Sequence, residues 1–267
     1  MPALRGPLRG PARGPVRAHQ ATGGGGAVTS IYDVTSAEDA NAVLQALAGT
    51  ADDLTPAALW TCDEAAGNLV DVIGGVELAP QNSAGTIVSP HGRAARQVAA
   101  SDEAWFTADT GALNFGLGAF AFAVRARHRT TTGGVWLGKG SPAGAHYQSR
   151  VLVDGSPVLW AKQSGGVLQA NVAANVLDDT WRWWLFGRSV TAQKLWLWVP
   201  EGYAEAAFAD TIDLSTTING FGLWSMSAFD AASVDCDTDH LIAFDASAAE
   251  NVYTNAAALG AALEAAE

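Results

Sequence analysis

Alternating apolar and polar or small side chains dominate the chain from about residue 57 to residue 246. In one such run, Phe120 and Phe122 fall on one face of an extended strand, and Arg125 and Arg127 fall on the other. This period of two is typical of β-strands. Many short runs of this kind are separated by turns rich in Gly, Asn and Asp, which predicts an all-β sandwich. Asp154-Gly155 lies between two runs and predicts a hairpin with a type I′ turn.

The segments on either side of this region have helical patterns. Residues 28–56 form a connector in which apolar residues recur with helical spacing between Ala40 and Leu47. Ser36 precedes them as a candidate N-cap, and Gly49 supplies a stop. Residues 247–267 are rich in alanine, and we expect a short helix in this C-terminal tail.

Residues 1–27 form a low-complexity arm in which arginine, glycine and proline recur every four residues. Collagen needs glycine at every third position, so the period does not fit a collagen helix. The composition favours extended polyproline II or disorder. We interpret the arm as an assembly arm that docks onto other subunits through its four arginines, Arg5, Arg9, Arg13 and Arg17. It lacks the apolar core of a signal peptide, so we expect no export signal.

Charge narrows the choice of partners. The whole chain has a net charge of −12, and the arm holds arginines but no acid, so the remainder is the acidic part. An acidic body repels nucleic acid and anionic membranes. The apolar runs are also shorter than a membrane span. We therefore expect neither nucleic acid nor a membrane as a partner.

The stretch ALWTCDEAAGNLVDVIGG at residues 58–75 has a distinctive order: Trp60, then Asp63-Glu64, two small residues, Gly67 and a turn that contains Asp71. It resembles the opening strand of laminin-G-like, concanavalin A-like lectin and glucanase domains. Later segments resemble further strands of the family: Gly118–Val124, Leu137–Gly140, the strand led by Trp181, and Asp239–Phe244. The resemblance implies a two-sheet antiparallel jelly roll over residues 57–246, of the kind found in phage virion structural proteins.

Three aspartates, Asp235, Asp237 and Asp239, alternate along one predicted strand and would stand in a row on one face. Glycosidases use carboxyl pairs at comparable separations, and related laminarinase-type glucanases share the implied fold. Those enzymes use glutamates, and this run has none, so we expect no catalytic residues. Calcium is the alternative ligand, since it favours clustered carboxylates, and Asp63 with Glu64 is a second candidate pair. The simplest interpretation of both sets is solvated edge carboxylates.

Aromatic and basic residues supply the remaining candidates. Trp183 and Trp184 are adjacent, so one of them must leave the inter-sheet core, where it would contact a protein neighbour, an appendage or a sugar. Arg125, Arg127 and Arg129 fit either an acidic neighbour or an ordinary outward face. The resemblance makes Cys62 and Cys236 neighbours, which allows a disulfide, although two buried free thiols are the simpler interpretation.

We therefore expect a non-enzymatic virion structural protein, either capsid-associated, a decoration protein or a tail component, assembled in the host cytoplasm. Its expected partners are other virion subunits such as the major capsid or tail protein, further copies of itself in a homo-oligomer, and a host glycan. No cofactor is expected apart from the candidate calcium. A bacterial carbohydrate-binding module or a glucanase-like glycoside hydrolase is the main alternative, and a subunit of a non-viral bacterial particle is another.

Overall fold

A computed structural model of the chain describes residues 30–101, 103–107, 113–129, 133–140, 146–163, 166–208, 213–214, 220–223 and 235–266. The predicted assembly arm, with Arg5, Arg9, Arg13 and Arg17, lies outside these residues. Neither α-helix in the described part of the chain has the length and apolar character needed to cross a bilayer.

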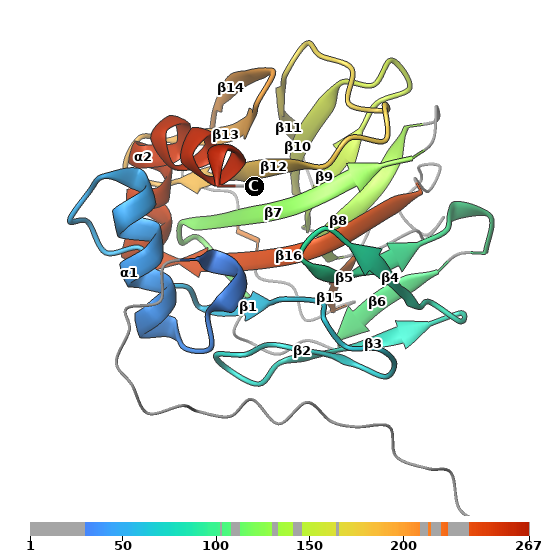
Figure 1. Ribbon diagram of the computed structural model, residues 1–267. Helices are drawn as coiled ribbons and strands as arrows, with labels where there is room; N and C mark the ends of the chain where they lie inside the picture. The colour runs from blue at the N-terminus through green and yellow to red at the C-terminus, as the bar shows by residue number, and fades with distance from the viewer. Residues whose placement is uncertain are drawn as a thin grey trace, which may run out of the picture.

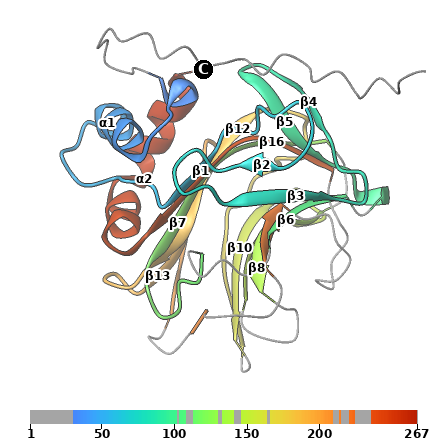
Figure 2. The same ribbon diagram turned by 90° about the horizontal axis from the view of Figure 1, so that it is seen from below.

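Two antiparallel sheets of eight strands each face one another (Figures 1 and 2), as the alternating pattern predicts. The first sheet consists of β1 (Ala58–Trp60), β4 (Thr86–Ser89), β5 (Gly92–Gln97), β7 (Phe120–His128), β12 (Arg182–Ser189), β13 (Lys194–Val199), β14 (Gly202–Ala207) and β16 (Cys236–Asp245). Its strand order is β14-β13-β12-β7-β16-β5-β4, and β1 also pairs with β16.

The second sheet has the order β11-β10-β9-β8-β15-β6-β3-β2. Its strands are β2 (Leu69–Val70), β3 (Glu77–Gln81), β6 (Ala104–Thr107), β8 (Gly134–Gly140), β9 (His146–Val151), β10 (Pro157–Gln163), β11 (Gly166–Asn171) and β15 (Phe221–Leu223). The helices are η1 (Ile31–Asp33), α1 (Ala37–Ala48), η2 (Ala99–Ser101) and α2 (Ala246–Ala265).

Each face of the first sheet has its own apolar core. Phe120, Phe122 and Trp184 point between the sheets and pack with residues of the second sheet. Residues of the opposite face, among them Trp183 and Trp196, pack under α1 and α2. Figure 2 shows both helices on this outer side of the sheet. The period of two that the sequence shows in β7 and β12 thus separates two buried layers.

Local signals fix several element ends. The Ser36 hydroxyl accepts a hydrogen bond from the Asp39 backbone N–H, and Gly49 ends α1 with φ of 65°, so both predicted caps of this helix are confirmed. The hairpin at Asp154-Gly155 is present between β9 and β10, but only Gly155 has positive φ, at 86°. The Gly155 N–H donates to the Leu152 carbonyl, which fits a type I turn followed by a left-handed glycine. The type I′ prediction is therefore wrong.

The motif that carries the family resemblance has a structural role here. The Asp71 carboxylate is buried and accepts hydrogen bonds from the backbone N–H groups of Leu59, Ile73 and Gly74, at 2.7–2.9 Å. It therefore closes the turn after β2 and ties that turn to β1. Cys62 and Cys236 are both buried free thiols, as the simpler interpretation had it, and burial raises the pKa of each.

Candidate functional site

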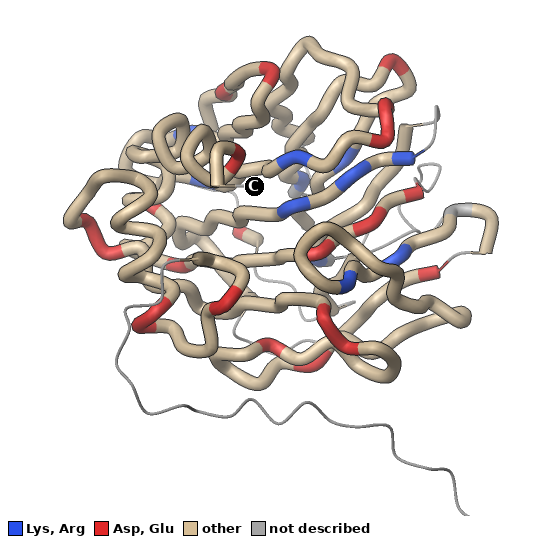
Figure 3. The backbone as a smooth tube through the Cα atoms, in the orientation of Figure 1, with Lys and Arg blue, Asp and Glu red and all other residues tan. Residues whose placement is uncertain are grey.

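The predicted aspartate row lies opposite the predicted arginine row. Asp237 of β16 is fully buried and pairs in register with Arg127 of β7 on one side and with Arg96 of β5 on the other. Its carboxylate lies 2.9 Å from Arg127 Nη2, 3.1 Å from Arg96 Nε and 3.1 Å from Arg129 Nε. In Figure 3, basic stretches of β5 and β7 lie on either side of the acidic stretch of β16.

Asp239 forms a second ion pair in the same cluster. A register shift between Thr238 and His240 marks a bulge at this residue. Its carboxylate accepts a hydrogen bond from Arg125 Nη1, and both side chains are at least 98% buried. The indole of Trp181 lies next to two of these arginines, with its centroid 4.8 Å from Cζ of Arg125 and 5.1 Å from Cζ of Arg127. We call Arg96, Arg125, Arg127, Arg129, Asp237 and Asp239 the arginine–aspartate cluster.

This geometry corrects the predictions made for the aspartates. Asp237 and Asp239 lie on a central strand and not on an edge, so they are not solvated carboxylates. Asp235 is separate and partly exposed, and its carboxylate lies 3.9 Å from Arg129 Nη1. Within the described residues, no three His, Cys, Asp or Glu side chains are placed to hold a metal ion. Guanidinium groups lie against Asp237 and Asp239 where a cation would bind, which argues against the calcium prediction for Asp235, Asp237 and Asp239.

The second acidic pair is also engaged by the protein itself. Asp63 Oδ1 accepts a hydrogen bond from the Arg93 N–H at 2.9 Å, and Glu64 Oε1 accepts one from the Val70 N–H at 2.8 Å. Burial raises the pKa of Glu64. These carboxylates hold the loop after β1 against its neighbours.

The adjacent tryptophans take opposite faces, as predicted, but neither is exposed. Trp184 lies in the inter-sheet core and Trp183 lies under the helices, and both have no accessible surface. The backbone N–H of Trp183 donates to the Glu264 carboxylate of α2. The outward tryptophan, Trp183, therefore contacts an appendage of the same chain, which is one of the predicted neighbours. Trp183 and Trp184 cannot bind a sugar or a second protein in this state.

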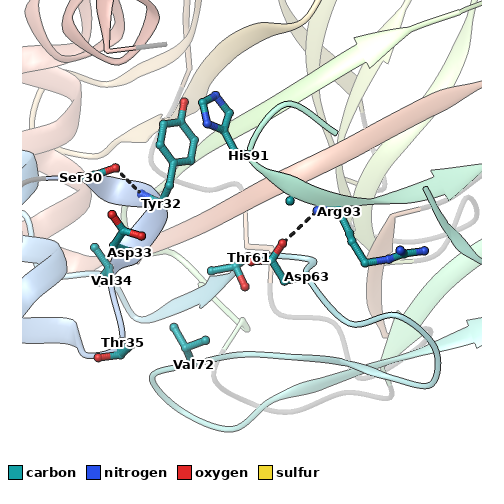
Figure 4. Close-up of a pocket in the computed structure, with 11 residues that line it drawn as sticks. Ser30, Tyr32, Asp33, Val34, Thr35, Thr61, Asp63, Val72, His91 and Arg93 are labelled. Atoms are coloured by element: carbon teal, nitrogen blue, oxygen red, sulfur yellow. Dashed lines mark hydrogen bonds between the residues drawn. The ribbon is translucent and has the colours of Figure 1, made fainter. Parts of the chain in front are cut away.

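A groove of about 960 Å³ lies between the connector and the sandwich (Figure 4). It is lined by Ser30, Tyr32, Asp33, Val34, Thr35, Thr61, Asp63, Val72, His91, Gly92 and Arg93. The Tyr32 ring stacks on the His91 ring, with centroids 3.6 Å apart and planes 6° from parallel. This stack joins η1 to the turn between β4 and β5 and forms one end of the groove in Figure 4.

The polar groups of the groove have defined places. Asp63 sits so close to the Gly92 backbone that a Cβ at residue 92 would lie 2.1 Å from its Oδ1, so a side chain is excluded there. The Arg93 guanidinium turns away and donates to Thr86, at 2.8 and 3.1 Å. Asp33 and Thr35 are exposed. Hydroxyl and carboxylate groups beside an aromatic stack suit a ligand that is itself rich in hydroxyl groups.

Sequence reasoning did not find this groove. Tyr32 lies in the connector and His91 in a Pro-His-Gly turn, 59 positions apart along the printed sequence. Neither residue belongs to a motif, and no spacing rule brings them together. Tyr32 and His91 meet because η1 crosses the outside of the first sheet.

No protein-family model and no curated protein sequence matches the chain. Solved structures do match. The binding domain of Paraclostridial Mosquitocidal Protein 1 matches with a TM-score of 0.53 and 11% identity, over 73% of this chain and 51% of that one. A structure of botulinum neurotoxin type C, whose uptake into cells depends on interaction with two ganglioside molecules, matches with a TM-score of 0.52 and 7% identity, over 74% and 50%.

The binding domain of botulinum neurotoxin DC in complex with SialylT gives a TM-score of 0.51 and 7% identity, over 75% of this chain and 50% of that one. This chain therefore spans about half the length of the solved structures that it matches. At these identities the likeness shows the fold alone: a two-sheet antiparallel β-sandwich of the type used in toxin binding domains.

Proposed function

We propose that the chain is a non-enzymatic, glycan-binding display protein and that the groove beside Tyr32 and His91 is its glycan site. The observation that carries the proposal is the groove itself, about 960 Å³ in volume, in which exposed Asp33 and Thr35 lie near an aromatic stack. Carboxylate and hydroxyl groups can accept and donate hydrogen bonds to sugar hydroxyls. The chain shares its fold with about half the length of toxin binding domains that interact with gangliosides or SialylT, which agrees with a glycan-binding role.

The arginine–aspartate cluster supports the absence of catalysis. A glycosidase needs one carboxyl that protonates the leaving group and another that acts as base or nucleophile. Asp237 is surrounded by three guanidinium groups and Asp239 by one. The guanidinium groups occupy the oxygens of both carboxylates, which suits a structural role rather than proton transfer.

The virion setting is the second part of the proposal. We place the chain in a phage particle as a capsid-associated, decoration or tail component, assembled in the host cytoplasm and present in several copies. Support comes from the sequence of residues 1–27, where arginines recur among glycine and proline. Such an arm gains order by docking onto other subunits, which then offset its loss of conformational entropy.

A glycan array tests the first part. The full chain is compared with a double variant, Asp33→Ala with Thr35→Ala, in which two exposed groups of the groove are removed. Glu38→Ala is the matched control, because Glu38 is an exposed acid nearby that does not line the groove. We expect the wild type and the control to capture glycan, and the double variant to bind about tenfold more weakly. Equal binding by the double variant would remove the groove from the proposal.

Deletion of residues 1–27 tests the second part. If the arm anchors the chain, the truncated protein fails to enter particles while its glycan binding stays intact. If the chain is instead a free carbohydrate-binding module, the truncated protein should still bind glycan, and neither form of the protein should be found in particles. Normal incorporation of the truncated protein would contradict the anchoring role of the arm.

A further inference from the structure

The outward face of the second sheet differs in kind from the outward face of the first. Along β9 and β10, Tyr147 and Leu159 point into the inter-sheet core. Side chains alternate along a strand, so the residues on either side of Tyr147 in β9 and of Leu159 in β10 point outward. The outward set consists of His146, Gln148 and Arg150 from β9, and of Val158, Trp160 and Lys162 from β10, so it is polar or aromatic at every position except the buried Val158. No apolar layer of the kind that packs under α1 and α2 is formed by these residues.

Trp160 is the centre of this face. It is partly exposed, unlike most tryptophans of the chain, and it pairs in register with Gln148. The guanidinium carbon of Arg150 lies 4.0 Å from the centroid of its indole. A flat ring held on one side by a cation is a rigid platform, and such a platform suits stacking against another flat or apolar ring surface.

Two polar atoms next to this platform lack partners. Gln148 is only 2% exposed, and its Oε1 makes no hydrogen bond, although its Nε2 lies 3.2 Å from His146 Nε2. The Trp160 Nε1 is also buried and without a hydrogen-bond partner. A buried polar atom that pairs with nothing is costly and calls for an explanation. An acceptor and a donor on two residues that pair in register are complementary to a hydroxyl group.

Glycines leave one cross-strand row next to Gln148 without side chains. Gly222 of β15 pairs with Gly138 of β8, and Gly138 pairs with Gln148. On the far side, Gly222 pairs with Phe106 of β6. In this row, the two glycine positions between Phe106 and Gln148 correspond to about 10 Å of sheet. A Cβ on Gly138 would lie 2.8 Å from the Tyr147 carbonyl and 3.0 Å from the Gln148 Cβ, so this approach requires glycine.

The charge of this part of the sheet is opposite to that of the chain. Of the charged residues near this face, Arg150 and Lys162 belong to the outward set, whereas Lys139 pairs in register with core-facing Tyr147 and Phe221 and is buried. The groove, in contrast, has two carboxylates. An anionic ligand is therefore favoured on the outward face of the second sheet and disfavoured at the groove.

From these observations we infer a second binding site on the outward face of β8, β9 and β10, which takes a carboxylate-bearing saccharide. The sugar ring stacks on Trp160, a ring hydroxyl pairs with Gln148 Oε1, and the basic side chains of the face favour the carboxylate. This inference rests on the proposed glycan-binding function and adds to it a place and a ligand class. Two sites of different charge would let one sandwich hold an acidic and a neutral part of the same glycan surface.

Titration calorimetry on the full chain tests the inference with two probes, sialyllactose and uncharged lactose. We expect sialyllactose to bind the wild type more tightly than lactose, and added salt to weaken it. Trp160→Ala should lower the affinity for sialyllactose at least tenfold, as loss of an aromatic anchor does. Trp160→Phe, which keeps a ring, should retain most of the affinity and shows that the strand still folds.

Two controls separate this site from the groove. Trp181→Ala removes an indole that packs on arginines of the other sheet and should leave sialyllactose binding within twofold of the wild type. The Asp33→Ala, Thr35→Ala variant should do the same. Unchanged binding by Trp160→Ala, an equal loss in Trp181→Ala, or preference for lactose would overturn the inference. If sialyllactose binding is lost in the Asp33→Ala, Thr35→Ala variant alone, the proposed function is kept and this second site is refuted.

Discussion

Asp237 of β16 lies opposite Arg127 of β7, and their carboxylate and guanidinium meet at 2.9 Å on the outward face of the first sheet. Two features that look unrelated in the sequence, a row of acids and a row of bases 110 positions apart, are thus partners. Because Asp237 has no accessible surface, the pairing is a structural one. It explains why an acidic run on this β-sandwich need not bind calcium or cleave a sugar.

Replacing Asp237 with Asn should destabilise the fold by about 3 kcal/mol, because three arginines lose their buried counter-charge. Urea unfolding measures this change. Asp235→Asn is the matched control, since Asp235 is partly exposed and its carboxylate lies 3.9 Å from Arg129 Nη1. It should change stability by less than about 1 kcal/mol. Similar effects for the two variants would contradict a central role for Asp237.

Gly260 should not tolerate even a methyl group. A Cβ at this position of α2 would lie 2.5 Å from Cε3 of Trp198, so the helix would have to move off the sheet. Alanine favours helices by about 1 kcal/mol over glycine, yet we expect Gly260→Ala to destabilise the chain by about 1–3 kcal/mol. Thermal unfolding followed by tryptophan fluorescence tests this. Ala258→Ser, on the exposed side of α2, should have almost no effect, and a stabilised Gly260→Ala would refute the close contact.

Stability should fall in acid because of His128. Burial, reinforced by the positive charge of Arg182, lowers the pKa of His128 to about 3 in the folded chain. The unfolded chain protonates this imidazole near its ordinary pKa of about 6.5, so folding stability is lost as the pH drops from about 6.5 toward 3.

At about pH 4.5 this loss amounts to roughly 2–3 kcal/mol relative to neutral pH. His128→Leu removes the titrating group, so its stability should depend less on pH by that amount. Denaturant unfolding of both proteins at the two pH values measures the difference. An unchanged pH dependence would show that His128 titrates normally in the folded state.

Glu250 should prove important for holding α2. Its carboxylate accepts hydrogen bonds from Ser189 Oγ at 2.5 Å, from the Val190 N–H at 2.7 Å and from the Thr191 N–H at 2.9 Å. Glu250→Ala leaves these donors at the end of β12 without their acceptor, which should cost about 2 kcal/mol in unfolding free energy. Hydrogen exchange should show faster opening of α2. Glu38→Ala, an exposed acid on α1, serves as control, and equal exchange in both variants would rule out the anchoring role.

The sequence contained enough information for the fold because the strands are amphipathic in a regular way. Phe120 and Phe122 against Arg125 and Arg127 define the two faces of β7. Ser36 and Gly49 define the ends of α1 through local hydrogen bonds and a positive φ. These signals depend on neighbouring residues only, so they can be recognised without the tertiary structure.

The candidate sites depend on contacts across the fold, and for this reason the sequence predicted them poorly. Trp183 is hydrophobic and leaves the inter-sheet core, as expected, but the packing of α2 on that face could not be derived from its alanine-rich sequence. The type of the turn at Asp154-Gly155 depends on whether one or two residues adopt positive φ, which the dipeptide alone leaves open. As a large apolar residue in a strand, Trp160 would be expected in the core, and only its pairing with Gln148 in the sheet places it on the outward face.

Binding without turnover is the central claim, and product analysis on a bound glycan tests it most directly. The wild-type chain is incubated with the oligosaccharide that it captures most strongly on an array, and new reducing ends are measured over time. We expect stable capture and no increase in reducing ends above a protein-free control. Release of new reducing ends by the wild type, abolished in Asp237→Asn or Asp239→Asn under conditions where the variant remains folded, would contradict the claim.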